Sequence, residues 1–220
     1  MLYSLQQVKD NIRNREGKRV FYLGKADQLT SEAKDYLTRE RIQILPGQAA
    51  KKERYRLLGG GYIEEKPEHM THLNAEFLVE KTNPRIVFRG AVDLLEAELL
   101  LAMGQLPDWK EELMQVLELA RQLIRCDVLE EPLPAGQLGG LDEEQLRNRS
   151  HFPQEYYGLP HFMPQPGDKP QVLLLNRLRS LVRQTELRAV AAFPDRTDLI
   201  RALNRMSSFL YILMLREKGK

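Results

Sequence analysis

The sequence predicts a mostly α-helical protein, in which an antiparallel bundle of about five helices follows a small β-α-β segment at the N-terminus. Three observations predict this fold. Apolar residues in the second half of the 220-residue chain recur at the spacing of helix faces. The first 45 residues contain one helix-like stretch between two strand-like stretches. A stretch rich in glycine and charge separates the two regions, so we expect domains at residues 1–60 and 61–220.

The N-terminal elements follow from local patterns. Arg19–Leu23 and Ile42–Leu45 are rich in β-branched, aromatic and aliphatic residues, which is typical of strands. Between them, a helix is expected to begin at an N-cap formed by Thr30 or Ser31. Pro46–Tyr62 has a proline, three consecutive glycines and the basic stretch KKERYR, and this composition predicts a linker.

The remaining chain predicts long helices. A first helix is expected to start near Gly90 and a second to follow the break GQLPDWK. Pro132–Pro170 is rich in proline, glycine and aromatic residues, so we expect a long connection with at most short helices. A helix from about Gln171 to Ala192 ends before Pro194. The helical spacing of apolar residues supports the first two helices: Val92, Leu95, Leu99 and Ala102, then Leu113, Val116, Leu117, Ala120, Leu123 and Ile124.

The last helix is predicted to begin near a cap at Asp195 or Thr197, and Leu199, Leu203, Met206, Leu210 and Leu213 form an apolar stripe along it. Four or more amphipathic helices joined in this way favour an antiparallel bundle.

Charge and composition exclude several classes of protein. The 33 basic and 31 acidic residues are interspersed and give a net charge of +2, which does not indicate a nucleic-acid-binding protein. One cysteine, Cys126, excludes an internal disulfide. No apolar run is long enough to span a bilayer and no leader pattern opens the sequence, so we expect no membrane association and a cytoplasmic location.

A charged stripe on the next-to-last helix is a candidate site. Arg179, Arg183 and Glu186 are spaced by four and three residues, so their side chains project from one face. A solvated face with a weak Arg–Glu pair is the alternative. Asn204 interrupts the apolar run of the last helix, where asparagine is mildly unfavourable, so it has either a ligand or a hydrogen-bond partner on a neighbouring helix.

A second candidate region precedes the first long helix. Lys81, Arg85 and Arg89 are expected in a loop that leads into that helix, where cations and backbone N–H groups can hold an anion such as a triphosphate. Asp93 is expected in the first turns of the helix, and simple capping is the alternative for it. The sequence has no Walker loop and no GxGxxG pattern.

Three stretches carry a resemblance to a known family. VEKTNPRIVFRGAVDLLEAELLLA, LNRLRSLVRQTELRAVAAF and LNRMSSFLYILMLRE resemble, in order, three signature regions of ATP:cob(I)alamin adenosyltransferases of the propanediol-utilisation type. The ethanolamine-utilisation subgroup is the most similar, and LTSEAKDYLTRERIQI resembles N-terminal segments of ethanolamine-utilisation proteins. The resemblance covers about residues 61–218 and implies a bundle of the cobalamin adenosyltransferase-like type.

The resemblance also implies residue roles on the nucleotide side. Lys81 is similar to the family lysine that contacts the ATP phosphates. Asp93 resembles an acidic residue that pairs across a subunit interface with the first arginine of an R-x-x-x-R-x-x-E motif, here Arg179. Arg183 and Glu186 then match the nucleotide-binding arginine and glutamate of that motif.

Further implied roles fall on Asn204, which matches the asparagine of a terminal Asn-Arg-Leu-Ser motif, and on Phe162, which resembles an aromatic residue facing the corrin. Tyr156, Tyr157 or Phe152 would help Phe162 to exclude water from that face.

The resemblance implies transfer of the 5′-deoxyadenosyl group of ATP to reduced cobalamin, with Mg²⁺ and release of triphosphate. It further implies a homo-oligomer, with a trimer favoured over a dimer and sites between subunits. A reductase, an adenosylcobalamin-dependent lyase and a bacterial microcompartment are implied associations.

Two departures from the family pattern affect the site. The phosphate loop Thr-x-Thr-Gly-Asp is not recognisable, and EHMTHLNAEF occupies its region, which leaves Thr71 as a phosphate candidate. Some ethanolamine-type members carry a His followed by a Cys-Cys-x-x-Cys metal site. Here His69 is followed at the matching positions by Lys81, Thr82 and Arg85, so we expect no structural or catalytic transition metal.

Two other functions remain open from the sequence. A non-catalytic corrinoid carrier or scaffold would use the same bundle without needing Mg-ATP. An RNA-binding bundle would use KKERYR, although one basic hexamer beside glycines is usually solvated linker.

Overall fold

The computed structural model describes residues 1–15, 18–47 and 55–220. The chain divides into two compact units. Met1–Tyr55 with Tyr62–Glu65 forms one unit, and Arg56–Gly61 with Lys66–Lys220 forms the other. Residues 48–54, which include Lys51 and Lys52 of the predicted linker, lie outside the described residues. The predicted domain boundary after residue 60 stays a prediction.

The first unit contains the predicted strand–helix–strand arrangement. Strand β3 (Lys18–Leu23) pairs in parallel with β5 (Gln43–Pro46), and helix α2 (Ser31–Arg39) connects them. The Thr30 hydroxyl accepts a hydrogen bond from the Ala33 N–H, so Thr30 is the N-cap. The other elements are β1 (Leu2–Tyr3), α1 (Leu5–Asp10), β2 (Arg13–Arg15) and β4 (Gln28–Leu29). Their small core consists of Val8, Phe21, Leu29, Ala33, Leu37 and Ile42.

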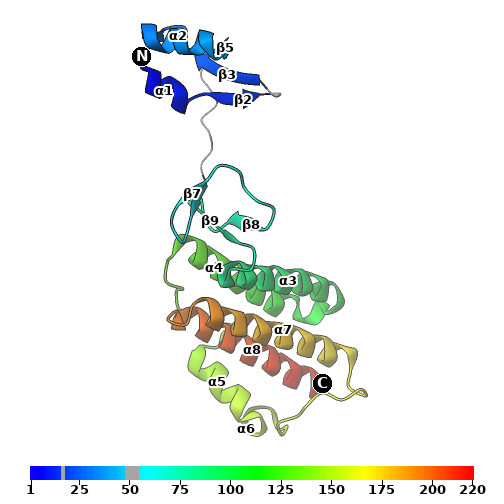
Figure 1. Cartoon of the computed structure of the whole chain (residues 1–220). Helices are drawn as coiled ribbons and strands as arrows, with labels where there is room; N and C mark the ends of the chain where they lie inside the picture. Colours follow the sequence, from blue (N-terminus) through cyan, green and yellow to red (C-terminus); the bar gives the residue numbers. More distant parts are fainter. Residues whose placement is uncertain (16–17, 48–54) are drawn as a thin grey trace. The chain divides into compact units, whose positions relative to one another are not determined.

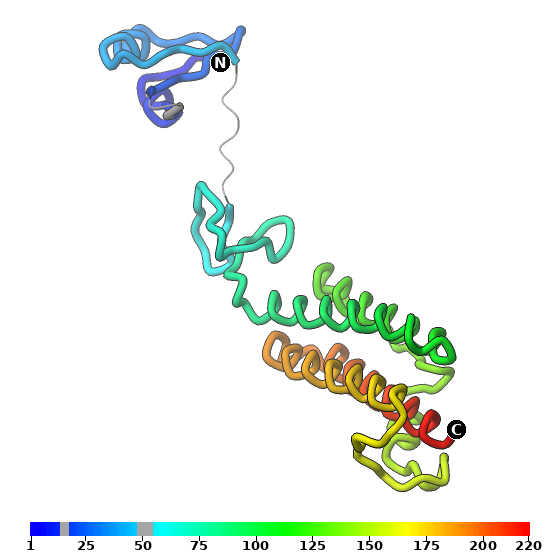
Figure 2. Tube along the Cα trace, turned by 90° about the vertical axis from the view of Figure 1, so that its right-hand side faces the viewer, coloured from blue at the N-terminus to red at the C-terminus, as the bar shows by residue number. Residues whose placement is uncertain are grey.

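Short strands precede the helices. They are β6 (Tyr55–Leu57), β7 (Tyr62–Ile63), β8 (Met70–His72) and β9 (Phe77–Glu80). Strand β9 pairs antiparallel with β8 and parallel with β6. The chain runs from β9 directly into the first long helix (Figure 2). The C-terminal end of the predicted linker from Pro46 to Tyr62 contains β6 and the first residue of β7.

The second unit contains the predicted bundle. Helix α3 (Pro84–Gln105) packs against α4 (Lys110–Leu129) and α7 (Pro170–Ala192), while α8 (Thr197–Lys218) packs against α7 and the short α5 (Glu143–His151), as Figure 1 shows. A 3-10 turn, η1 (Pro107–Trp109), separates α3 from α4, and α6 (Pro153–Tyr157) follows α5. The long connection with short helices is confirmed. The predicted helix from about Gln171 to Ala192 is confirmed as α7. It ends at Ala192, as expected from the proline at position 194.

One predicted helix start and one predicted cap are wrong. Helix α3 begins at Pro84 and not near Gly90, because the Asn83 side chain caps it and Pro84 occupies a first-turn position that needs no N–H donor. Consequently Arg85 and Arg89 lie in α3 rather than in a loop, and Asp93 lies beyond the first turns. Helix α8 has Arg196 as its N-cap residue, with no side-chain cap hydrogen bond, instead of Asp195 or Thr197.

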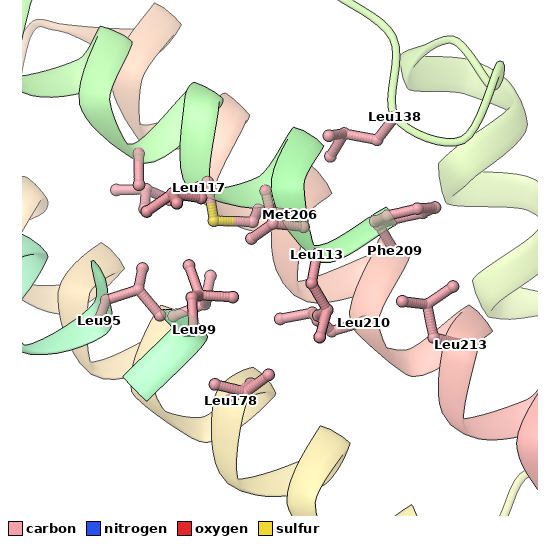
Figure 3. Packing of buried hydrophobic residues seen from close by; sticks show 14 of the residues in the cluster. Leu95, Leu99, Leu113, Leu117, Leu138, Leu178, Met206, Phe209, Leu210 and Leu213 are labelled. Carbon is pink, nitrogen blue, oxygen red and sulfur yellow. The ribbon is translucent and has the colours of Figure 1, made fainter. Parts of the chain in front are cut away.

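The bundle core is built from the apolar stripes that the sequence predicts. Leucines of α3, α4, α7 and α8 interdigitate around Met206 (Figure 3). Leu95, Leu99, Leu113, Leu178 and Leu210 are completely buried. Removal of this apolar surface from water is the main term that stabilises the bundle.

A polar contact fastens the C-terminal end of the bundle. The indole N–H of Trp109 donates a hydrogen bond to the Glu217 carboxylate over 2.8 Å, and both residues are buried. The Lys220 ammonium lies 4.3 Å from the centroid of the Trp109 ring. The end of α8 is therefore bound to the turn between α3 and α4. Among the described residues, no helix combines the length and apolar character that a bilayer crossing requires.

Candidate functional site

Helices α7 and α8 place the predicted nucleotide-binding residues against each other. The Asn204 side-chain amide donates a hydrogen bond from Nδ2 to Glu186 Oε1 over 3.2 Å. Arg205 Nη1 in turn donates to Asn204 Oδ1 over 3.1 Å. Both ends of the Asn204 amide are therefore engaged, and its orientation is fixed. The hydrogen bond to a neighbouring helix that the sequence left open for Asn204 is present.

The two arginines of the stripe differ in environment. Arg179 is half-buried and donates from Nε and Nη2 to the Asn176 side-chain oxygen, while Arg183 is exposed. Burial, and then the neighbouring charge of Arg183, lower the pKa of the Arg179 guanidinium. Two guanidinium groups that repel each other are favourably placed to bind an anion, since an anion neutralises both.

A cavity beside this stripe contains Phe162. It has a volume of about 580 Å³, and Arg179 and Phe162 both line it. The remaining lining residues include two from the connection before α7 and several from α8: His161, Met163, Ser207, Ser208, Tyr211 and Met214. The structure therefore brings together the predicted corrin-facing aromatic residue and the first arginine of the stripe.

The other aromatic residues of the long connection lie elsewhere. Tyr157 lines a separate hollow with Trp109 and Leu215, and Phe152 and Tyr156 are about half exposed. None of these three lines the cavity that contains Phe162. Their predicted help in forming a wall beside Phe162 is therefore not supported by the fold of this chain.

Lys81 and Thr71 come from the strands before α3. Thr71 lies in β8 opposite Val79 of β9, and the Lys81 backbone N–H donates to the His69 carbonyl over 2.8 Å. Lys81 and Asp93 are exposed, and Thr71 is half-buried. Among the described residues, the side chains of Lys81, Thr71 and Asp93 make no hydrogen bond or ion pair within this chain, so they are available to a ligand or a second subunit.

Arg85 and Arg89 have a structural partner that the sequence did not reveal. The Asp127 carboxylate, completely buried on α4, accepts from Arg89 Nε over 2.6 Å and from Arg85 Nε over 2.9 Å. Arg89 Nη1 also donates to the Leu73 carbonyl over 2.6 Å. These contacts tie both arginines, which are expected from the sequence to hold an anion, to Asp127, although Arg89 Nη2 is buried without a partner, and they fix the β8–β9 strands against α3 and α4.

Potential metal ligands are scattered. Within the described ranges no group of three His, Cys, Asp or Glu side chains is placed to hold a metal ion. His69 faces Glu80 with 3.7 Å between Nε2 and Oε1, and both side chains are largely exposed. Cys126 is buried in α4, and burial raises the pKa of its thiol.

Sequence reasoning missed Tyr211, His161 and Asp127. Tyr211 contacts the Phe162 backbone and ring from a position 49 residues later in the sequence, and His161, the residue before Phe162, contacts the Tyr211 hydroxyl. An aromatic residue seven positions after Asn204 was the signal available for Tyr211, since that spacing places it on the same face of the helix.

Comparisons with known proteins agree on one family. Residues 61–217 match the family model for cobalamin adenosyltransferase. The corrinoid adenosyltransferase EutT of Salmonella typhimurium is 34% identical over 165 residues, which cover 72% of this chain and 62% of the relative. EutT of Escherichia coli K12 is 34% identical over 160 residues, covering 70% and 60%. The chain thus spans less than two thirds of these relatives.

Solved structures share the fold at low identity. Two variants of the PduO-type ATP:corrinoid adenosyltransferase from Lactobacillus reuteri, each complexed with cobalamin and ATP, superpose on the chain with TM-scores of 0.54 and 0.50. They are 16% and 15% identical and cover 67% and 76% of this chain and 87% and 89% of theirs. Because the family model covers most of the chain and the EutT relatives are 34% identical, the chain belongs to the cobalamin adenosyltransferase family.

Proposed function

We propose that the protein transfers the 5′-deoxyadenosyl group of ATP to the cobalt of cob(I)alamin. The cobalt electron pair attacks the ribose 5′-carbon, the new Co–C bond forms as the C–O bond to the phosphate breaks, and inorganic triphosphate leaves with the electron pair. One observation carries the proposal: Arg179, which shares one face of α7 with Arg183 and Glu186, lines the same cavity as Phe162. Membership of the family supports the same reaction.

The basic residues serve the leaving triphosphate. Arg183 is exposed on the same face of α7 as Arg179, so its guanidinium is free to bind phosphate oxygens. Lys81 is similarly exposed and adds a second cation. Charge that is already in place when triphosphate forms stabilises the transition state without reorganisation. Thr71 and Asp93 complete the proposed set, with Asp93 pairing with Arg179 of a neighbouring subunit.

Glu186 and Asn204 fix the nucleotide. Mg²⁺ binds proteins through one or two carboxylates together with substrate phosphates, and the half-buried Glu186 carboxylate fits that requirement. The ion would neutralise phosphate charge when bound. Asn204 orients the Glu186 carboxylate through its hydrogen bond.

Phe162 serves the corrinoid. Its ring lines the cavity from the side of the long connection, where an apolar surface excludes water from one face of the corrin. Loss of the lower axial ligand makes the cobalt easier to reduce, and an apolar ring has no atom that replaces that ligand. The PduO-type structures with the same fold are complexed with cobalamin and ATP, which supports both substrates.

Assembly and cellular context are further parts of the proposal. We propose a homo-oligomer with sites between subunits, a trimer being favoured, and a role in ethanolamine breakdown because the EutT relatives carry that link. A reductase that supplies cob(I)alamin, a lyase that takes the product, a cytoplasmic location and association with a bacterial microcompartment remain predictions.

Turnover by the purified protein tests the proposal. Wild-type protein with Mg-ATP and cob(I)alamin is expected to form adenosylcobalamin and triphosphate. The loss of cob(I)alamin absorbance measures the reaction. Arg183→Ala is expected to abolish turnover while circular dichroism shows a folded bundle. Arg188→Ala is the matched control, because Arg188 lies on the same helix and bonds to Gln184. Wild-type turnover in Arg183→Ala would contradict the proposal, and corrinoid binding without triphosphate release would indicate a carrier.

A further inference from the structure

The segment that carries Phe162 is attached to α8 through one side chain. The Phe162 backbone N–H donates a hydrogen bond to Tyr211 Oη over 3.1 Å. The Tyr211 hydroxyl also lies 3.3 Å from His161 Nδ1. One phenol therefore contacts two consecutive residues of the connection between α6 and α7, and these residues lie about 50 positions earlier in the sequence.

The direction of the hydrogen bonds follows from their partners. His161 Nε2 lies 2.9 Å from the His151 carbonyl oxygen, at the end of α5, and a carbonyl oxygen only accepts. In neutral His161 the proton is therefore on Nε2, and Nδ1 accepts the Tyr211 hydroxyl proton. The Tyr211 oxygen is left to accept the Phe162 N–H. Every polar group in this chain of three hydrogen bonds thus has a partner of the right kind.

Ring contacts reinforce the same arrangement. The Tyr211 ring is stacked with the Phe162 ring at a centroid distance of 5.8 Å and with the His161 ring at 5.9 Å. The Lys218 ammonium lies 4.5 Å from the Phe162 ring centroid and 2.6 Å from Asp168 Oδ1. The Phe162 ring therefore contacts two residues of α8, Tyr211 and Lys218, which share one face because they are seven positions apart.

The same face of α8 carries Asn204, seven positions before Tyr211. Asn204 contacts Glu186, and Tyr211 contacts the Phe162 segment. One rigid helix thereby fixes the distance between the nucleotide residues and the aromatic residue of the cavity, because both are attached to it by side-chain hydrogen bonds.

We infer that Tyr211 is the positioning residue for Phe162, and that it acts through its hydroxyl group together with His161. This role rests on the proposed function, in which Phe162 faces the corrin. Without the hydroxyl the ring of residue 211 still packs, but the Phe162 backbone loses its attachment to α8. The KM for the corrinoid should then rise, whereas the KM for ATP should not.

Kinetics of full-length Tyr211→Phe test the inference, because phenylalanine keeps the ring and removes the hydroxyl. The KM for the corrinoid is expected to rise about two- to tenfold, the range for one hydrogen bond, while the KM for ATP stays within about twofold. Tyr36→Phe is the matched control: its phenol accepts a hydrogen bond from Arg19 in the first unit. An unchanged corrinoid KM, or equal increases in both KM values, would overturn the inference.

A double-mutant cycle tests the shared network. His161→Phe keeps an aromatic ring and removes both ring nitrogens. If Tyr211 and His161 act as one unit, the double variant should have a corrinoid KM no higher than that of the more affected single variant. Multiplicative effects of the two substitutions would show that the residues act separately, against the inference.

Hydrogen exchange supplies a readout that needs no turnover. In substrate-free Tyr211→Phe, the Phe162 amide should exchange at least about threefold faster than in the wild type, since its N–H has lost its acceptor. Unchanged exchange would refute the attachment itself. If the wild-type protein forms no adenosylcobalamin although exchange responds as expected, the proposed function fails and the attachment of Phe162 to Tyr211 stands.

Discussion

Asn204 and Glu186 form the side-chain contact that joins α8 to α7 at the candidate site, with 3.2 Å between Nδ2 and Oε1. A polar residue in the middle of an apolar helix is explained by this partner. Because Arg205 binds the other end of the Asn204 amide, the donor rather than the acceptor faces Glu186. The contact therefore depends on an amide at position 204.

Replacement of that amide by a carboxylate is the most direct test. Asn204→Asp places a second negative charge beside Glu186 and removes the donor, so we expect the KM for ATP to rise at least about tenfold, with a lower melting temperature. Steady-state kinetics and thermal denaturation provide the measurement. Gln184→Glu, which adds the same charge on an exposed part of α7, controls for charge alone. Equal effects of the two substitutions would contradict the role of the contact.

Phe162→Ala should slow turnover more when the reaction starts from cob(II)alamin than when it starts from cob(I)alamin. Loss of the ring removes an apolar surface worth roughly 1.5–3 kcal/mol, so we expect a roughly 10- to 100-fold lower rate when the reaction starts from cob(II)alamin and a reductant. Starting from cob(I)alamin, the loss should be smaller because no reduction is needed. Rates measured from both starting states provide the comparison. A loss of the same size from both would remove Phe162 from the corrin face.

The buried carboxylate of Asp127 should be important for stability. Asp127→Ala leaves Arg85 and Arg89 without their buried partner, so we expect a loss of about 3–5 kcal/mol in the free energy of unfolding, measured by urea denaturation. Glu130→Ala is the matched control because Glu130 pairs with the same Arg85 at the surface, where its side chain is 68% exposed, and should cost about 0–1 kcal/mol. Comparable losses in the two variants would contradict this account.

Asp198 should make the free energy of unfolding depend on pH in the acid range. Hydrogen bonds from Arg196 hold the pKa of the Asp198 carboxyl well below its ordinary value of 3.8. A lowered pKa in the folded state stabilises the protein fully above the ordinary value, and this contribution disappears as the pH falls toward the folded-state pKa. The difference in unfolding free energy between wild type and Asp198→Asn should therefore be largest and constant above about pH 5, and should shrink steadily as the pH falls below about 4. Parallel curves in urea titrations between pH 3 and 7 would refute the assignment.

Helix periodicity predicted the bundle because burial of one face leaves a regular trace in the sequence. The predicted end of α7 at Ala192 is confirmed, since Pro194 is incompatible with a continued helix. The start of α3 was missed although Asn83 and Pro84 carry the cap and first-turn signals. Gly90 lies inside α3 and does not begin it, so Arg85 and Arg89 belong to the helix and not to a loop.

Contacts between segments that are far apart in the chain have no comparable pattern in the sequence. Asp127 lies 38 residues from Arg89, and Tyr211 lies 49 residues from Phe162. No local spacing indicates that such residues meet, because their contact depends on how whole helices pack. Motif resemblance selected Arg179, Arg183, Glu186 and Asn204, and helical spacing placed the first three on one face. The partners that orient site residues required the fold.

The buried contact between Trp109 and Glu217 makes tryptophan fluorescence a probe of one place in the bundle. Trp109 is the single tryptophan of the sequence, so all indole emission comes from the place where the last turn of α8 meets the junction of α3 and α4. Detachment of that last turn alone would bring the indole into water and shift its emission to the red, while unfolding confined to the first unit would leave the signal unaltered. The chain thus carries an intrinsic fluorophore where the turn between α3 and α4 contacts the C-terminal end of α8.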